Sequence, residues 1–317
     1  MNLKHLAAVS IAAITAVSFA QNPLDQIKGL AQESSKVKLD FKQNKRVLKA
    51  NQPPYCTDNY TFVTPSNKLT VYYHYFMNQP PEFTGKHPAL LHSLGGIGLS
   101  GKSFAFWYYG GMIRIYVNNI DIMQQKIAKV STKCGKNGNI EFVWNWGKAS
   151  KFTLQLIVPS EGNRVYARLI PEISPLDKKV NHIKIRLTGY PGGFGPAYKQ
   201  PSHRYVKFSD GKEEILDAGK IMKKQITLPG DVKWAFLADK LQKKGAIGFV
   251  LEKIAGGNHN LNLSSYGSSF YLNYQGCPKA VNFALYAFET TNEVSFNTFK
   301  NRASSDYQEM LSIKYGE

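Results

Sequence analysis

The amino-acid sequence predicts a mostly β protein built as one large antiparallel β-sandwich, with a polar N-terminal leader before it and a short helix after it. Apolar and polar residues alternate in about a dozen short runs, which is the pattern of half-buried strands. In the run 112–122, for example, Ile113, Ile115 and Val117 fall on one face. Turn-forming Gly, Pro, Asn and Asp separate the runs, and no long helix alternates with them, so a parallel α/β sheet is disfavoured.

Residues 1–20 have the layout of a secretory signal peptide. The start is basic, residues 6–19 are almost wholly apolar or small, and Ser18-Phe19-Ala20 places small residues before a cleavage site. The apolar run is shorter than the roughly 20 residues that a permanent membrane-spanning helix needs. We therefore expect cleavage before Gln21, a secreted or periplasmic protein, and no transmembrane segment after removal of the signal.

Residues 21–57 are predicted to form a polar leader or linker that is partly helical, around residues 24–30. The stretch is rich in Lys and poor in apolar residues, and Pro53 and Pro54 lie near its end. The β-sandwich domain is then expected to cover residues 58–317.

The candidate strands are short and follow one another through this domain. The first group comprises residues 61–64, 69–77, 103–109 and 112–122, and Gly110-Gly111 is expected to separate the last two runs. The later runs are residues 152–158, 165–169, 183–187, 232–238, 246–253, 261–266, 270–274 and 281–289. Helical spacing of apolar residues predicts one helix from about Asn301 to Tyr315.

The chain is strongly basic, with 40 Lys and Arg against 22 Asp and Glu and a formal net charge of +18. Such a charge favours anionic partners, among them acidic polysaccharide, anionic lipid and nucleic acid. Lysines scattered over a solvated surface would explain much of the charge without any ligand. Residues 178–253 nevertheless hold 16 Lys and Arg against 7 Asp and Glu. This clustering favours a glycan-binding or surface role, and nucleic acid is not favoured as a partner.

The three cysteines, Cys56, Cys134 and Cys277, are widely spaced. No C-x-x-C pair occurs, so neither a redox dithiol nor a zinc site is predicted, and no cofactor or metal is expected. The sequence allows either three free thiols or one disulfide and one free thiol. An oxidising compartment slightly favours the disulfide.

One segment matches a phosphate-binding loop letter for letter. Residues 96–103 fit G-x-x-x-x-G-K-S, in which Lys102 and Ser103 would bind phosphate and magnesium at the start of a helix. Residues 104–109 are instead aromatic and strand-like, and no helix is predicted after the segment. We therefore interpret it as a Gly-rich loop between strands and expect no nucleotide partner.

Aromatic and basic residues supply the candidate ligand-binding side chains. The chain has 18 Tyr, 18 Phe and 4 Trp, and exposed rings can pack against sugar rings while Arg and Lys bind acidic groups. In an antiparallel sheet about half of such rings face the core instead. The candidates, which include two in the Gly- and Pro-rich turn at residues 190–196, are Trp107, Tyr109, Arg168, Lys184, Arg186, Tyr190, Phe194 and His259.

The residue pattern of several segments resembles that of secreted bacterial β-sandwich proteins of the galactose-mutarotase-like, or supersandwich, group. These segments are the Gly-rich loop before Trp107-Tyr108-Tyr109-Gly110-Gly111, the strand ending in Val117-Asn118-Asn119, and the strands with Arg168 and Arg186 that flank the turn Tyr190-Pro191-Gly192-Gly193. The resemblance spans residues 65–290 and implies a supersandwich fold that binds or modifies carbohydrate. The group's His and Glu that transfer protons have no position-by-position match here. His259 and Glu289 would be the residues to take that role.

Three functions follow as hypotheses. The first is a carbohydrate-binding protein, with acidic polysaccharide as one candidate ligand. The second is a carbohydrate-active enzyme, mutarotase-like or lyase-like, although no G-x-S-x-G or H-E-x-x-H motif occurs and no catalytic residue can be named. The third is a structural or envelope-interaction protein without a small ligand.

Overall fold

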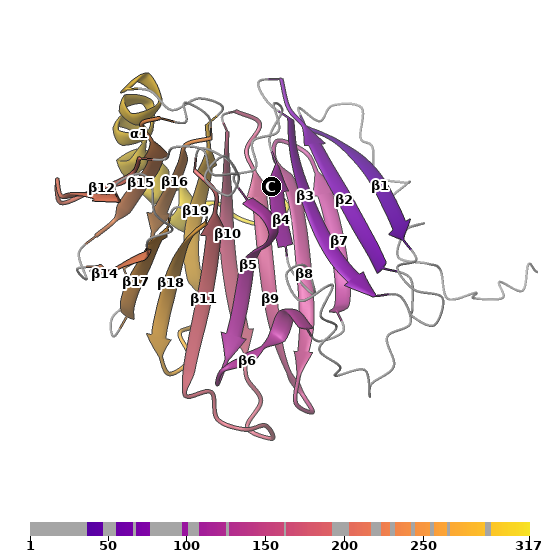
Figure 1. Cartoon of the computed structure of the whole chain (residues 1–317). Helices are drawn as coiled ribbons and strands as arrows, with labels where there is room; N and C mark the ends of the chain where they lie inside the picture. Colours follow the sequence, from indigo (N-terminus) through magenta and orange to yellow (C-terminus); the bar gives the residue numbers. More distant parts are fainter. Residues whose placement is uncertain are drawn as a thin grey trace, which may run out of the picture.

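In the computed structural model, two large antiparallel sheets lie face to face and one helix packs at the C-terminal end (Figure 1). The mostly β sandwich expected from the sequence is therefore confirmed. The predicted signal peptide, the helix expected near residues 24–30, Trp107, Phe194 and Glu289 all lie outside the described residues. The structure describes residues 37–46, 55–65, 68–76, 97–100, 108–124, 127–161, 163–191, 203–216, 223–228, 232–241, 245–253, 257–264, 267–288 and 293–317.

The ten-stranded sheet is a series of antiparallel neighbours. In spatial order its strands are β1 (Lys38–Arg46), β2 (Tyr55–Val63), β3 (Lys68–Phe76), β4 (Ile97–Ser100), β5 (Tyr108–Val117), β11 (His182–Gly189), β18 (Ser268–Gln275), β17 (Gly257–Ser264) and β14 (Lys223–Leu228). The tenth strand, β6 (Ile120–Asp121), pairs with β5. The turn between them is Asn118-Asn119, with φ of 48° and 68°, a conformation that asparagine tolerates in tight hairpins.

The nine-stranded sheet packs behind the first one. Its spatial order is β13 (Glu213–Leu216), β12 (Arg204–Phe208), β15 (Trp234–Asp239), β16 (Ile247–Leu251), β19 (Val281–Ala287), β10 (Arg164–Glu172), β9 (Ser150–Val158), β8 (Gly138–Trp146) and β7 (Ile127–Cys134). A short 3-10 helix, η1 (Ile122–Gln124), follows β6.

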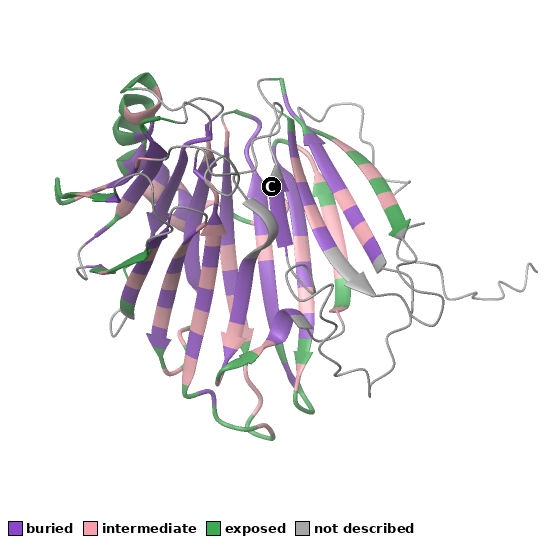
Figure 2. Cartoon of the chain, in the orientation of Figure 1, coloured by how far each residue is buried: buried purple, intermediate pink, exposed green. Residues whose placement is uncertain are grey.

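Alternation along the strands directs one face of each sheet into a shared core, which appears as banded colouring in Figure 2. On β11, for example, Ile183, Ile185 and Leu187 are fully buried, while the residues between them are partly exposed. A buried arginine also joins the two sheets. Nη1 of Arg204, on β12, donates to the carbonyl oxygen of Ser264 on β17 at 2.7 Å.

The helix α1 (Glu293–Ser312) covers part of the outer face of the nine-stranded sheet, next to β15, β16 and β19 (Figure 1). Its Phe299, Ala303 and Met310 are buried in a second apolar cluster. Gly248 on β16 allows this approach, because a Cβ there would lie 2.6 Å from the Phe299 ring. The predicted helix is confirmed but begins eight residues earlier than expected. Among the described residues, no helix has the length and apolar character of a membrane span.

The sheet begins inside the segment expected to be a leader. β1 and the start of β2 both precede residue 58. Leu39 and Phe41 pack against the core, while lysines on the other face give this edge strand a charged surface. The third inward position is polar, and the amide of Gln43 there donates to Asp58 at 2.8 Å. This polar residue interrupts the alternation that would have marked the strand in the sequence.

Two glycine-containing segments expected as loops are strands. β5 runs without a break through Gly110 and Gly111, and β4 lies within the phosphate-loop match. Gly98 of β4 lies directly under the ring of Tyr72, where any Cβ would collide with it. The glycine therefore serves close packing across two strands.

All three cysteines are free thiols, so the slightly favoured disulfide is not formed. Cys56 is buried, Cys134 is half-buried and Cys277 is exposed.

Candidate functional site

Two rows of side chains cross the outer face of the ten-stranded sheet at right angles to its strands. Cross-strand pairing sets both rows, because directly opposed residues in an antiparallel pair lie on the same face. The Lys184 row runs over β6, β5, β11, β18 and β17 as Asp121, Tyr116, Lys184, Asn273 and Asn258. The Arg186 row runs over β5, β11, β18, β17 and β14 as Arg114, Arg186, Tyr271, Asn260 and Thr227.

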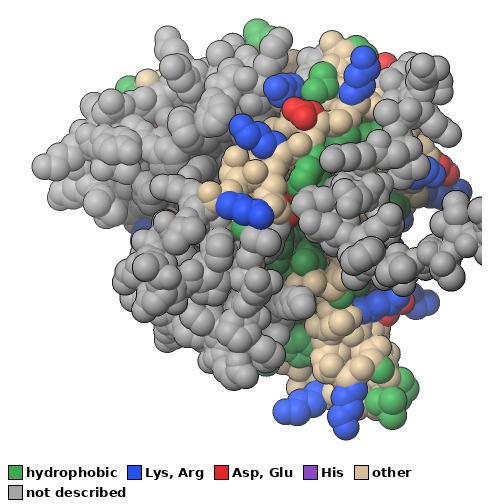
Figure 3. Space-filling view, turned by 90° about the vertical axis from the view of Figure 1, so that its right-hand side faces the viewer, with side chains coloured by type: hydrophobic (Ala, Val, Ile, Leu, Met, Phe, Trp, Pro, Cys, Tyr) green, Lys and Arg blue, Asp and Glu red, His purple; other side chains and the backbone are tan. Residues whose placement is uncertain are grey.

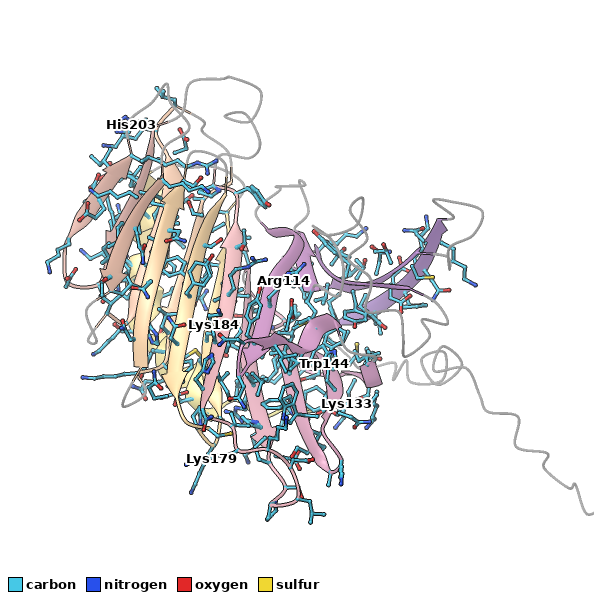
Figure 4. The ribbon with its side chains drawn as sticks, turned by 60° about the horizontal axis from the view of Figure 1, so that its bottom comes forward. Arg114, Lys133, Trp144, Lys179, Lys184 and His203 are labelled. Atoms are coloured by element: carbon cyan, nitrogen blue, oxygen red, sulfur yellow. The ribbon has the colours of Figure 1, made fainter. Side chains whose placement is uncertain are left out.

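The rows face outward because their sequence neighbours are apolar and buried. Ile115 on β5, Ile185 on β11, Leu272 on β18 and Leu261 on β17 are all fully buried between the sheets. A strand has a period of two, so each intervening residue is directed to the other face. Figure 4 labels Arg114 and Lys184, which come from the neighbouring strands β5 and β11.

The first charge on this face is neutralised within the chain. Nη1 of Arg114 lies 2.7 Å from Oδ2 of Asp121, and both side chains are more than nine-tenths buried. Burial raises the pKa of Asp121, and the charge and hydrogen bond of Arg114 oppose that shift. The backbone N–H of Met123 donates to the other carboxylate oxygen at 3.0 Å, which fixes its orientation. This acid is therefore committed to Arg114.

The other two cations have no carboxylate of their own among the described residues. Nζ of Lys184 lies 4.6 Å from the centroid of the Tyr116 ring, a cation–π contact. Nε of Arg186 is buried and makes no hydrogen bond within the described part of the chain. Burial also raises the pKa of Tyr116, so its hydroxyl stays protonated at neutral pH. Two positive charges beside tyrosine rings are thus available to a ligand that carries acidic groups.

Amide side chains occupy the far end of both rows. Asn258 and Asn260 alternate along β17 with His259 and Leu261, which are buried. Nδ2 of Asn273, on β18, donates to the backbone carbonyl of Asn258 at 2.9 Å. The face therefore changes from cationic at β5 and β11 to neutral and amide-rich at β17.

The structure brings together two of the eight residues predicted for the site, Lys184 and Arg186. Trp107 and Phe194 lie outside the described residues, and only the backbone of Tyr109 is described. The Tyr190 ring, beyond the end of β11, lies against Gly267, where a Cβ would be 2.9 Å from it.

Arg168 and His259 have structural positions elsewhere. Arg168 is on β10 of the other sheet, where Nε donates to Asn282 at 2.7 Å and Nη2 donates to the carbonyl of Leu311 at 3.1 Å. It thereby stabilises the last turn of α1, which has no basic residue of its own there. His259 is buried in the core with its ring 5.3 Å from that of Tyr274, and burial lowers its pKa.

Sequence reasoning missed Arg114, Tyr116, Asp121 and Tyr271 as site residues. The alternation of β5 did place Arg114 and Tyr116 on its polar face, but only cross-strand register joins them to β11 and β18.

The basic segment 178–253 does not form one surface. Arg204 is buried in the core, Lys207 lies over the Phe296 ring of α1 at 4.3 Å, and Lys224 pairs with Glu214. Figure 3 shows a different side of the molecule, the one at the right of Figure 1, where the Lys and Arg side chains in view also lie in separate places. Within the described ranges, no group of three His, Cys, Asp or Glu side chains is arranged to hold a metal ion.

Comparison with known proteins identifies the fold and no family. No family model matches the chain, and no curated protein matches it in sequence. The α-N-acetylgalactosaminidase NagBb from Bifidobacterium bifidum is similar over 78% of this chain, with a TM-score of 0.50 and 9% identity. A TPR-domain containing protein from Parabacteroides distasonis is similar over 83%, with a TM-score of 0.50 and 7% identity.

The chain spans 39% of the glycosidase and 57% of the TPR-domain protein. At these identities, the likeness shows a shared β-sandwich fold.

Proposed function

We propose that this protein is a carbohydrate-binding β-sandwich protein, and that its ligand is an acidic polysaccharide lying along the Lys184 and Arg186 rows. One observation carries the proposal. Lys184 and Arg186 present two positive charges on a partly exposed sheet face, between tyrosines, and neither makes an ion pair among the described residues. A carboxylate or sulfate of the ligand would supply the missing partner.

The side chains suit the two parts of an acidic sugar. The guanidinium of Arg186 can hold a carboxylate or sulfate with two parallel hydrogen bonds, and Lys184 adds a point charge. The half-exposed rings of Tyr116 and Tyr271 offer apolar surface to the faces of sugar rings, and their hydroxyls can bond to sugar hydroxyls. Binding energy would thus come from charge and from ring packing together.

Two further points support the proposal. The signal-like layout of residues 1–20 supports a role outside the cytosol, where polysaccharides are exposed. A sandwich of this fold also occurs in a protein named as an α-N-acetylgalactosaminidase, which fits a carbohydrate-related role.

Affinity chromatography on immobilised polygalacturonate, across a salt series, tests the proposal. The double variant Lys184→Gln/Arg186→Gln should bind about tenfold more weakly or worse, because charge-assisted hydrogen bonds are lost. The parent's retention should fall steeply with salt, since exposed charges are screened over about 8 Å at physiological ionic strength.

The matched control is Lys178→Gln/Lys179→Gln, which removes two exposed charges from the connection before β11. Both side chains are exposed, and Figure 4 shows Lys179 below Lys184, at the end of β11 where Asn118 donates to the Lys179 carbonyl at 2.9 Å. This control should elute close to the parent. Equal retention of the parent and both double variants, or no retention of any, would overturn the proposal.

A further inference from the structure

Three asparagines face outward at successive alternate positions of β17. They are Asn258, Asn260 and Asn262, and the residues after them, His259, Leu261 and Leu263, are all buried. Asn262 lies opposite Gln225 of the edge strand β14, which adds a further amide. The outer face of β17 is therefore lined by neutral amide groups.

Folding alone does not account for these residues. Asparagine is depleted in β-strands, where Thr or Val would suit the half-buried face better. Within the described part of the chain, the side-chain amides of Asn260 and Asn262 make no hydrogen bond. A strand that carries three residues of low strand propensity, with no compensating side-chain contact, is expected at a functional surface.

The register connects these amides with the cations. Asn260 lies in the Arg186 row, with Tyr271 between it and Arg186. Two strand spacings separate β11 from β17, about 10 Å. A short stretch of polysaccharide lying along the row could contact the guanidinium and the amides at once, with Tyr271 between them.

We propose that the amide end is a second subsite, which binds a neutral sugar bearing an acetamido group. This inference rests on the proposed function and specifies its ligand class: a polysaccharide in which acidic sugars alternate with N-acetylated sugars. A carboxamide offers one acceptor oxygen and two N–H donors, which complement the N–H and C=O of an acetamido group. Lys223 is exposed on the same face of β14 as Gln225, but it lies opposite Ser264, one alternate position beyond the Asn262–Gln225 pair. The amide side chains themselves carry no charge, so an acidic sugar lying over Asn260 would gain no ion pair from them.

Calorimetric titration with two probes of matched charge number tests the assignment. One probe is a hyaluronan oligosaccharide, with alternating glucuronate and N-acetylglucosamine, and the other is an oligogalacturonate, which has only acidic sugars. The parent should bind hyaluronan more tightly. Asn260→Ala/Asn262→Ala should weaken hyaluronan binding about tenfold, because hydrogen bonds from two amides are lost. The same variant should weaken oligogalacturonate binding by a clearly smaller factor, because that probe has no acetamido group for the amides to bind.

The matched control is Asn145→Ala/Asn181→Ala, two exposed asparagines outside the rows, which should leave both affinities unchanged. If the two probes bind the parent equally, or if the Asn260/Asn262 variant binds hyaluronan as the parent does, the second subsite is wrong. The proposed function would still stand if Lys184→Gln/Arg186→Gln weakens both probes. If that cation variant changes neither affinity, the proposed function itself fails.

Discussion

The outer faces of the two sheets carry the same Arg-x-Tyr arrangement and satisfy it in different ways. On β10 of the nine-stranded sheet, Nε of Arg164 donates to the hydroxyl of Tyr166 at 2.7 Å. Helix α1 then supplies Glu309, which accepts from Nη2 of Arg164 at 3.0 Å and from the Tyr166 hydroxyl at 2.5 Å. A second helix acid, Asp306, lies 3.6 Å from Nε of Arg164.

On β5 of the ten-stranded sheet, Arg114 and Tyr116 repeat the pattern, and the neighbouring strand adds Lys184 and Arg186. Here the described chain supplies one carboxylate close to these cations, that of Asp121, and it is bound to Arg114. The difference teaches that closely spaced cations on the face of a sheet require carboxylates, or other anions, to neutralise them. One face receives them from the protein's own helix, and we propose that the other receives them from a ligand.

The largest expected effect comes from removing Arg164, whose charge the helix carboxylates already neutralise. Arg164→Gln would remove the buried cation beside two helix carboxylates, one of which is itself almost fully buried. We expect the free energy of unfolding to fall by about 3–5 kcal/mol, as for other broken buried ion pairs. Urea unfolding measures the change.

The control for that experiment is Arg302→Gln. Arg302 contacts the same Asp306 at 3.5 Å, but its side chain is 44% exposed. Its loss should cost less than about 1 kcal/mol. A similar cost for both variants would mean that the buried network does not hold the helix in place.

The carboxylates of the two faces should respond to acid with opposite signs. Burial alone would raise the pKa of Glu309, but hydrogen bonds from Tyr166 and Arg164 outweigh it, and its pKa lies below the ordinary value. A lowered pKa in the folded state adds stability above the unfolded pKa, near 4.3, and this stability is lost as the pH falls through the folded pKa. The raised pKa of Asp121 acts in the opposite sense, because near pH 4 the folded state holds its proton more tightly.

Urea unfolding from about pH 6 to about pH 3 tests this difference. On acidification, Glu309→Gln should lose less stability than the parent, and Asp121→Asn should lose more. The comparison uses the slope against pH, because both variants also change stability at neutral pH. Parallel slopes for the two variants would contradict the opposite shifts.

The smallest expected effect is on the proposed ligand-binding face. Arg186 lies directly opposite Arg114, and its buried Nε makes no hydrogen bond among the described residues. Arg186→Gln should therefore leave the free energy of unfolding unchanged or raise it by up to about 1 kcal/mol. The same urea titration measures it, and a loss above about 2 kcal/mol would show that Arg186 has a structural role like that of Arg164.

The sequence by itself determined the class of fold, the presence of the C-terminal helix and the two faces of individual strands. Alternation in β11 was enough to place Lys184 and Arg186 together on its polar side, because side chains in a strand have a period of two. The same local pattern separated Arg114 and Tyr116 from the apolar residues of β5.

Only the tertiary structure decided which polar positions meet and which face a partner already covers. Arg168 and Arg186 both looked like ligand-binding arginines, yet α1 packs over the sheet that carries Arg168. His259 is polar but occupies an inward position of β17, so it is buried. Strand order and register bring together residues from distant parts of the chain, and a period of two cannot encode them, because it specifies a side of the strand and not its neighbours.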